Sequence, residues 1–217
     1  MVNKVLFTFA VIITPFWILG ISTKIAFSEW FIDYEYSKLN FPDDRWGLSD
    51  EVRKKLAKLG LKAVLTEEGL KEFKEARFPN GKKAFREKEV KHMEDVNRFL
   101  SKFFIATYIL ATVWLFVLIL QKKQIWKLLI YSSIYTFLFF AIVSLIVFVS
   151  YEKAFEVFHN FFFGKTSWRF SKYDTLLRIY PMKFWFDGTT ILSIIAFFIN
   201  TFILSLGIIL RGKYAKT

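Results

Sequence analysis

Four stretches of the chain contain no Asp, Glu, Lys or Arg over a length that is sufficient to cross a lipid bilayer. They are residues 5–23, 103–120, 128–151 and 188–210. A transmembrane helix needs about 17–25 predominantly apolar residues, whereas a helix in the core of a soluble domain keeps a polar stripe on its exposed face. The sequence therefore predicts an all-α membrane protein with four transmembrane helices.

The charges between these stretches predict how the helices are oriented. The segments 1–4, 121–127 and 211–217 carry seven basic residues and no acidic ones. The larger loops, 24–102 and 152–187, together carry 24 basic and 19 acidic residues. Short and purely basic segments are retained in the cytoplasm. We therefore expect both termini in the cytoplasm, and both larger loops outside the cell membrane.

The net charge of +12 would also fit a protein that binds nucleic acid. Seven of the basic residues, however, lie in cytoplasmic segments that are too short to form a folded binding surface, and the larger loops are close to neutral. We therefore expect membrane lipid, and no nucleic acid, as a partner. Residues 1–217 are expected to form a single membrane domain.

Helix-capping residues in the first large loop predict a small helical extracellular cap. Ser49, which is followed by two acidic residues, starts one helix, and Gly60 is expected to end it. Thr66, which is also followed by two acidic residues, starts a second helix. From Glu87 onward no residue interrupts a helix until Leu120. The second transmembrane helix is therefore expected to extend outward as one continuous rod.

Several kinds of catalytic site are excluded by composition and motif. The chain has no cysteine and only two histidines. It also lacks a glycine-rich phosphate loop, a Gly-x-Ser-x-Gly elbow and a His-Glu-x-x-His motif. We expect neither a metal site nor a cofactor.

The two histidines, His92 and His159, both fall in the outer loops. If helical geometry continues outward from the transmembrane helices, His92 lies roughly 16 Å above Phe103 and His159 roughly 12 Å above Tyr151. Either one alone would be read as an ordinary loop histidine, but their matched heights indicate a shared cleft. Asp95 follows His92 by three residues and is expected to fix the tautomer of its imidazole.

The second large loop is unusually rich in aromatic residues. Such rings are typical of the lipid–water boundary, and they could equally form a cleft that holds acyl chains. The sequence leaves both interpretations open. The residues concerned are Phe155, Phe158, Phe161, Phe162, Phe163, Trp168, Phe170, Tyr173, Tyr180, Phe184, Trp185 and Phe186.

At these residues the sequence resembles the lipoprotein intramolecular transacylases, over nearly the whole chain. The most specific part of the resemblance is His92-Met93-Glu94-Asp95-Val96 with the later Phe158-His159. A lysine-rich run at 82–86 departs from the more apolar family pattern. The matching segments are 45–53 (RWGLSDEVR), 77–81 (RFPNG), 89–96 (EVKHMEDV), 158–163 (FHNFFF), Trp168, 174–176 (DTL) and Tyr180-Pro181.

The resemblance implies an enzyme, an intramolecular O-to-N acyltransferase of the bacterial cell envelope. Its substrate would be a diacylated lipoprotein, whose sn-2 acyl chain moves from the glycerol oxygen to the amine of the N-terminal cysteine and leaves a lyso-form lipoprotein. On this interpretation His92 is the base, oriented by Asp95. His159 is then the acid or the oxyanion donor, and the two roles could be exchanged.

The same resemblance implies that the substrate contacts Trp168, Arg169, Arg178 and Tyr180, at the outer leaflet. The two arginines could donate to the oxyanion, although cations at a membrane interface more often only snorkel to water. The alternative function is a non-catalytic membrane protein that docks lipoproteins or cell-wall enzymes. A transporter is disfavoured, because no transmembrane stretch carries a charged residue.

Overall fold

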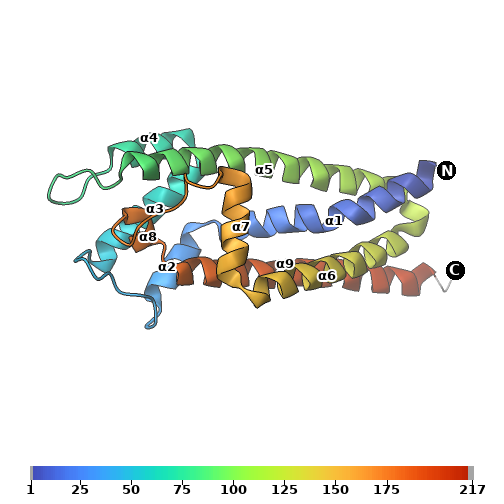
Figure 1. The fold of residues 1–217 in the computed structure, drawn as a ribbon. Coiled ribbons are helices and arrows are strands. Elements are labelled where there is room, and N and C mark those ends of the chain that lie inside the picture. The colour runs from blue at the N-terminus through green and yellow to red at the C-terminus, as the bar shows by residue number, and fades with distance from the viewer. Residues whose placement is uncertain (1, 215–217) are drawn as a thin grey trace. The chain divides into compact units, whose positions relative to one another are not determined.

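The computed structural model describes residues 2–214, and this part of the chain is built from helices joined by turns and loops (Figure 1). In chain order the elements are α1 (Val2–Ala26), α2 (Glu29–Ser37), α3 (Asp50–Leu65), α4 (Glu67–Glu75), α5 (Glu87–Leu120), the 3₁₀ helix η1 (Lys122–Gln124), α6 (Ile125–Val149), α7 (Tyr151–Phe163), α8 (Thr175–Ile179) and α9 (Met182–Tyr214).

These elements form two compact units. Unit 1 contains residues 1–25, 103–150 and 191–217, and unit 2 contains residues 26–102 and 151–190. Unit 1 therefore takes the apolar lengths of the long helices, whereas unit 2 takes nearly all of the two larger loops. The helix α5 contributes its first turns to unit 2 and the remainder to unit 1.

Four helices in the described part of the chain are long and apolar enough to cross a membrane, as predicted. They lie at Lys4–Ala26, Glu87–Leu120, Lys122–Val147 and Met182–Lys213. The third helix is displaced toward the N-terminus relative to the predicted stretch, because α6 begins at Ile125 and ends at Val149, and the chain is extended at Ser150 before α7 begins. The fold is thus an all-α membrane protein.

Two close contacts join helices within unit 1. A Cβ added to Gly20 of α1 would lie 1.9 Å from the Oγ1 atom of Thr107 on α5, so only glycine permits this approach. The side-chain amide of Asn200 on α9 donates to the carbonyl of Ser133 on α6, at 3.0 Å. An amide inside a bilayer is costly unless it is bonded in this way, so Asn200 joins α9 to α6.

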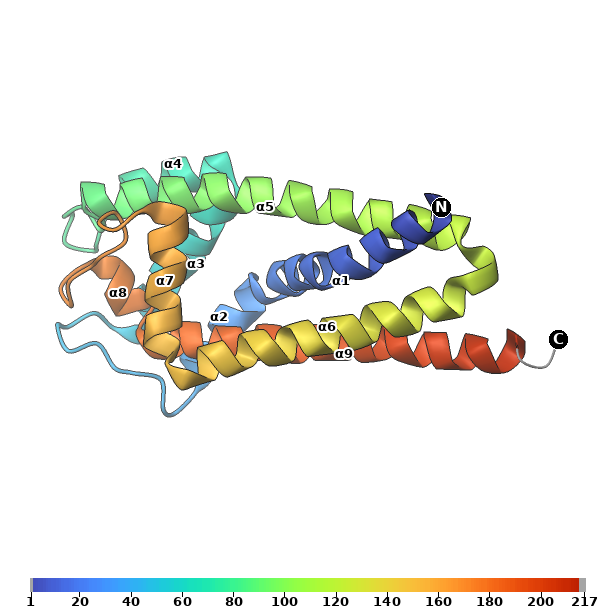
Figure 2. The same cartoon turned by 45° about the vertical axis from the view of Figure 1, so that its right-hand side comes forward.

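In unit 2, α3, α4 and the first turns of α5 lie side by side in both views of the ribbon (Figures 1 and 2). The predicted caps are present. Ser49 accepts from the backbone of Val52 at 3.4 Å, and Thr66 accepts from Gly69 at 3.0 Å. The amide of Asn97 on α5 donates to the Ala63 carbonyl at 2.9 Å and so fixes α5 against α3.

The predicted end of the first cap helix at Gly60 is wrong, because α3 continues to Leu65. The glycine has a packing role instead. A Cβ at Gly60 would lie 2.6 Å from the hydroxyl oxygen of Tyr180, which belongs to the second loop. Gly60 therefore allows a tyrosine from a distant part of the chain to pack against the helix.

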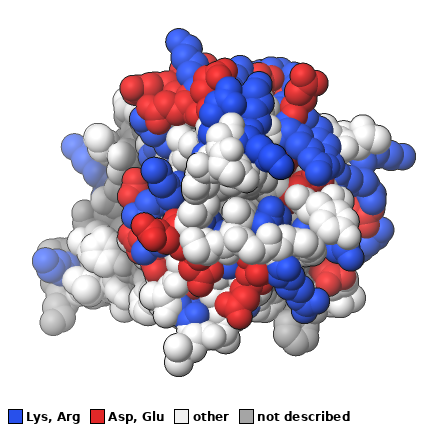
Figure 3. Space-filling model, turned by 90° about the vertical axis from the view of Figure 1, so that its left-hand side faces the viewer, with Lys and Arg blue, Asp and Glu red and all other residues white. Residues whose placement is uncertain are grey.

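Acidic and basic side chains are interspersed on the face seen in Figure 3. Part of the lysine-rich face of α3 is neutralised by α2. Lys58 lies 3.1 Å from Glu29 and 3.0 Å from Asp33, and Lys54 lies 2.8 Å from Asp33. Because the lysines face carboxylates, they join two helices of unit 2 rather than forming a free basic stripe.

Candidate active site

His92 lies in the second turn of α5, within unit 2, and is buried. Its imidazole is enclosed by aromatic rings from the second loop. Phe163 and Phe170 meet it edge-on, each with 5.3 Å between ring centroids. The ring of His159 lies 6.1 Å away and is inclined by 30°. The structure therefore brings the two histidines of the chain together.

His159 lies on α7 and has a defined tautomer. Its Nδ1 atom is 2.8 Å from the carbonyl oxygen of Phe155, one helical turn earlier. Because a carbonyl can only accept, Nδ1 carries the proton and donates it. In the neutral ring the Nε2 atom is then unprotonated and keeps a lone pair. The ring is held between Phe155, at 3.9 Å, and Trp168, at 5.0 Å.

Burial favours the neutral form of both imidazoles. Burial and, to a smaller extent, the nearby His159 together lower the pKa of His92 to about 4. Burial also lowers the pKa of His159, although the bond to the Phe155 carbonyl acts in the opposite direction. The Nδ1 atom of His92 is buried and has no hydrogen-bond partner. Burial of both rings therefore favours the neutral form of the imidazole, which carries one N–H donor and one nitrogen lone pair.

Asp95 does not make the predicted contact with His92. Its carboxylate lies 3.7 Å from the Lys91 ammonium and 3.9 Å from the Arg98 guanidinium. Residues three positions apart can meet on a helix, but here the carboxylate of Asp95 lies beside the two cations and makes no hydrogen bond to the imidazole. The expected orienting bond is therefore absent, and the tautomer of His92 is not set by Asp95.

Trp168 and Arg169 lie in the wall beside His159. The indole N–H of Trp168 donates to the side chain of Asn160 at 3.1 Å, which fixes the ring against the imidazole. The guanidinium of Arg169 lies 5.1 Å from the Trp168 ring and pairs with Glu156 at 2.8 Å. Trp168 thus contacts a histidine directly, whereas Arg169 forms an outer layer.

Arg178 and Tyr180 contact neither histidine. The guanidinium of Arg178 binds both carboxylate oxygens of Asp44, at 2.9 and 2.8 Å, and this pairing lowers the pKa of Asp44 to about 2. The hydroxyl of Tyr180 donates to the carbonyl of Ala57 on α3. These contacts occupy the polar groups of both residues, so the predicted role in substrate binding has no support from their positions.

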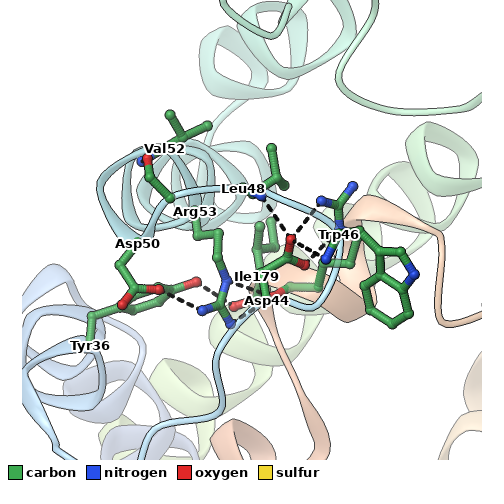
Figure 4. A network of polar contacts seen from close by, with 10 residues as sticks. Tyr36, Asp44, Trp46, Leu48, Asp50, Val52, Arg53 and Ile179 are labelled. Carbon is green, nitrogen blue, oxygen red and sulfur yellow. Dashed lines mark hydrogen bonds and ion pairs between the residues drawn. The ribbon is translucent and has the colours of Figure 1, made fainter.

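A second arginine, the buried Arg53, completes this structural network. Arg53 donates to the carbonyl of Arg178 at 3.1 and 2.9 Å and pairs with Asp50 at 2.6 Å (Figure 4). The guanidinium also lies 5.4 Å from the ring of Tyr36. The Tyr36 hydroxyl donates to Ile179 at 2.8 Å, which ties α2 to the same segment.

The sequence interpretation did not assign Phe155, Phe163 and Phe170 individually, yet these rings enclose the histidine pair. The signal was present in the aromatic density of the second loop. The rings of this segment have different surroundings: Phe161 is 80% exposed, whereas Phe163, two residues later, contacts both imidazoles.

A groove in unit 2 shares Phe163 with the histidine pair. Its apolar side is formed by aromatic rings and its polar side by charged residues of α5. The groove is lined by Asp95, Arg98, Phe99, Lys102, Phe162 and Phe163.

Within the described residues, no group of three or more His, Cys, Asp or Glu side chains could hold a metal ion.

The fold and the site together define an all-α integral membrane protein in which two histidines lie side by side among aromatic rings. The family model for the lipoprotein intramolecular transacylase Lit matches residues 8–185 of the chain. The chain therefore belongs to the lipoprotein intramolecular transacylase family, and it is a membrane transacylase.

Similar proteins extend over the full length of the chain. A protein of Aquifex aeolicus (strain VF5) is 50% identical over 217 residues, which is 98% of this chain and 100% of that protein. The structure of the lipoprotein intramolecular transacylase Lit from Bacillus cereus is 20% identical, with a TM-score of 0.82 over 100% of this chain and 99% of that one. A variant of that protein with a histidine replaced by alanine gives a TM-score of 0.77 over 100% and 96% of the chains, at 20% identity.

Proposed function

We propose that the histidine pair moves the sn-2 acyl chain of a diacylglyceryl-modified lipoprotein onto the amine of its N-terminal cysteine, which yields a lyso-form lipoprotein. The observation that carries this proposal is the pair of neutral imidazoles, 6.1 Å apart and enclosed by aromatic rings. The chain has no cysteine, and neither imidazole is hydrogen-bonded to a serine or threonine. A substrate that carries its own nucleophile fits this arrangement.

The reaction needs a base and an electrophilic donor. The unprotonated Nε2 atom of His159 is suited to be the base, because its Nδ1 proton is held by Phe155. As the free amine attacks the ester carbonyl, His159 takes a proton from the nitrogen. It then returns a proton to the sn-2 oxygen as the carbon–oxygen bond breaks. The products are an amide and a free glycerol hydroxyl, and no proton is gained or lost.

His92 is suited to be the donor. A histidine with a lowered pKa stays neutral, and its N–H group can donate to the carbonyl oxygen on which negative charge develops. The roles first expected for the two histidines are therefore exchanged. Attack within one molecule closes a ring of about eight atoms, so much of the rate gain would come from holding amine and ester together.

The groove beside Phe163 is the proposed binding place for one acyl chain. Phe99 and Phe162 give it an apolar side, while Arg98 and Lys102 can face the polar glyceryl region. On this proposal Trp168 packs against the reacting part of the substrate, because its ring already contacts His159. Diacylated lipoproteins and membrane lipid are the partners.

The proposed orientation places both termini in the cytoplasm and unit 2 at the outer leaflet of the cell membrane. The support is the distribution of charge. The short segments at the termini and between α5 and α6 are purely basic, whereas the loops that form unit 2 are nearly balanced.

The proposal is tested with purified protein in lipid and a synthetic diacylglyceryl-cysteine peptide. Wild type should convert the peptide to the N-acyl lyso-form, whose mass equals that of the substrate, so tandem mass spectrometry must locate the acyl chain. His92→Asn and His159→Asn should each lose at least about 100-fold in rate. Glu94→Gln is the matched control, because Glu94 lies on α5 like His92 but is not part of the histidine pair, and this variant should keep the wild-type rate.

Two outcomes would contradict the proposal. Wild-type protein that binds the peptide without moving the acyl chain would favour the docking alternative. A wild-type rate in either histidine variant would remove that residue from the chemistry.

A further inference from the structure

The segment that follows Phe170 is tied to the residues just before and within the first turn of α5. The hydroxyl of Thr175 donates to the carbonyl of Ala84 at 2.6 Å. Glu89 and Asp174, both buried, make the remaining contacts. The start of α5 and the segment after Phe170 are far apart in sequence, so hydrogen bonds and ion pairs of side chains, rather than local chain geometry, hold them together.

Glu89 links the two loops through a single carboxylate. One oxygen accepts from the backbone N–H of Arg86 at 2.8 Å and so caps α5. The other accepts from the backbone N–H of Leu176, in the second loop, at 2.6 Å. Burial raises the pKa of Glu89, while the two backbone bonds oppose that shift. The side chain is wholly buried, and both of its oxygens are occupied by these backbone bonds.

Asp174 makes the matching contacts from the other side. Its carboxylate accepts from the backbone N–H of Ser171 at 2.6 Å and is bound by the ammonium of Lys88. The guanidinium of Arg86 lies 3.0 Å from its other oxygen. Asp174 is fully buried, so these partners compensate the cost of removing its charge from water.

Phe170 immediately precedes this segment, and its ring is one of the two that meet His92 edge-on. We propose that Glu89 and Asp174 are positioning residues, which hold the 171–176 segment on α5 and thereby keep Phe170 against the imidazole of His92. The hydrogen bonds and ion pairs of their carboxylates go to other groups than the two histidines. The inference rests on the proposed function only for its catalytic consequence, because the contacts among these side chains are structural facts.

Release of the segment would admit water to His92. The charged and titratable groups around the imidazole are few. His159 faces it from α7, and the Nζ atom of Lys88 lies 5.6 Å from the centroid of the Phe170 ring. Asp95 is held by Lys91 and Arg98. Hydration should therefore dominate, and it shifts the pKa of a buried imidazole upward toward its ordinary value.

The chain allows a direct test, because it has only two histidines. Diethyl pyrocarbonate modifies the neutral imidazole, and peptide mass spectrometry separates His92 from His159. The rate of modification is measured against pH in the intact protein in detergent. Glu89→Gln and Asp174→Asn should raise the apparent pKa of His92 by about one unit or more and raise its limiting rate. Thr175→Val should act in the same direction with a smaller shift.

Phe170→Ala provides the reference for a displaced ring, and it should shift His92 at least as far as Glu89→Gln does. Combining the two substitutions should add little, because both act through Phe170. His159 is the internal control, since its bond to Phe155 lies within α7. Glu94→Gln, which removes an ion pair between α5 and Lys74 of α4, should leave the His92 profile unchanged.

A shift in Phe170→Ala without a shift in the carboxylate variants would overturn the proposal. So would equal shifts of His92 and His159, or a shift in Glu94→Gln, because either would indicate general loosening. If the carboxylate variants fail to fold, Thr175→Val alone decides: an unchanged His92 profile overturns the proposal. The modification profile needs no turnover, so its outcome is independent of whether the acyl transfer is found.

Discussion

Two of the places in which unit 2 encloses polar side chains differ in how their polar groups are satisfied. Around Arg53 and Asp44 every charge meets an opposite charge, a carbonyl or an aromatic face. Around His92 and His159 the neighbours are aromatic rings, and one buried ring nitrogen has no partner.

The difference indicates what each place does. A fully bonded buried network fixes the chain and leaves no group available for chemistry, although removing one partner is costly. An unbonded imidazole in an apolar enclosure costs stability and is retained where a substrate supplies the missing partner. Substitutions in the first region should therefore change stability, and substitutions in the second should change turnover.

The largest effect is expected at the histidine pair. His92→Ala and His159→Ala should each lower kcat by about 1000-fold, because each removes one side of the proton transfer. The double variant should be no more than about threefold slower than the slower single variant, since residues that act as a unit are not additive. Turnover of the synthetic peptide measures this, and thermal unfolding should change little. Additive losses would show that the two rings act independently.

The next effect is expected at Arg53, and it should appear in stability. Arg53→Met should lower the free energy of unfolding by about 3 kcal/mol, because it leaves Asp50 and the Arg178 carbonyl without their donor. Thermal unfolding in detergent gives the loss. At temperatures where the variant stays folded, its kcat should match wild type. A loss of kcat without a loss of stability would show that the Arg53 network contributes to turnover, and would contradict the distinction between the two regions.

A smaller effect, with a defined pH dependence, is expected at Asp44. Its pKa falls from 3.8 to about 2 because Arg178 binds the carboxylate. A carboxyl group with a lowered folded-state pKa stabilises the protein above its unfolded pKa and loses that contribution as pH falls through the folded value. Wild type should therefore lose about 2 kcal/mol between pH 4 and pH 2 from this group.

Asp44→Asn should lack that part of the pH dependence and should be less stable than wild type at pH 7. Unfolding in detergent at several pH values checks both statements. Asp43→Asn is the matched control, because the neighbouring carboxylate has no such partner among the described contacts. Equal effects of the two substitutions would mean that the Arg178 pairing contributes no specific stability.

Much of the fold follows from local sequence, and the parts that do not follow depend on distant contacts. Charge-free stretches predict transmembrane helices because a bilayer imposes that pattern on the chain. Ser49 and Thr66 predict helix starts because a cap bonds within its own first turn. Gly60 gave a wrong helix end for the opposite reason. The glycine makes room for Tyr180, which lies 120 positions later in the sequence.

The site divides in the same way. The two histidines could be chosen from the sequence because the chain has no others and the motif around them is specific. Arg178 and Tyr180 could not be separated from site residues, because only the fold shows that Asp44 and Ala57 occupy their polar groups. The bond from His159 to Phe155, which assigns the tautomer, likewise needs a side-chain rotamer that sequence does not specify.

The smallest effect on kcat is expected at Asp95, where the spacing in the sequence suggested a contact with His92 that the structure does not show. Its carboxylate pairs with Lys91 and Arg98 at the edge of the groove and has no bond to His92. Asp95→Asn should therefore change kcat by less than about threefold, since weak and partly exposed ion pairs contribute about 0–1 kcal/mol. An effect on KM would place the carboxylate in contact with the substrate through the groove. A loss of kcat as large as that of His92→Ala would restore the orienting role that the spacing first suggested.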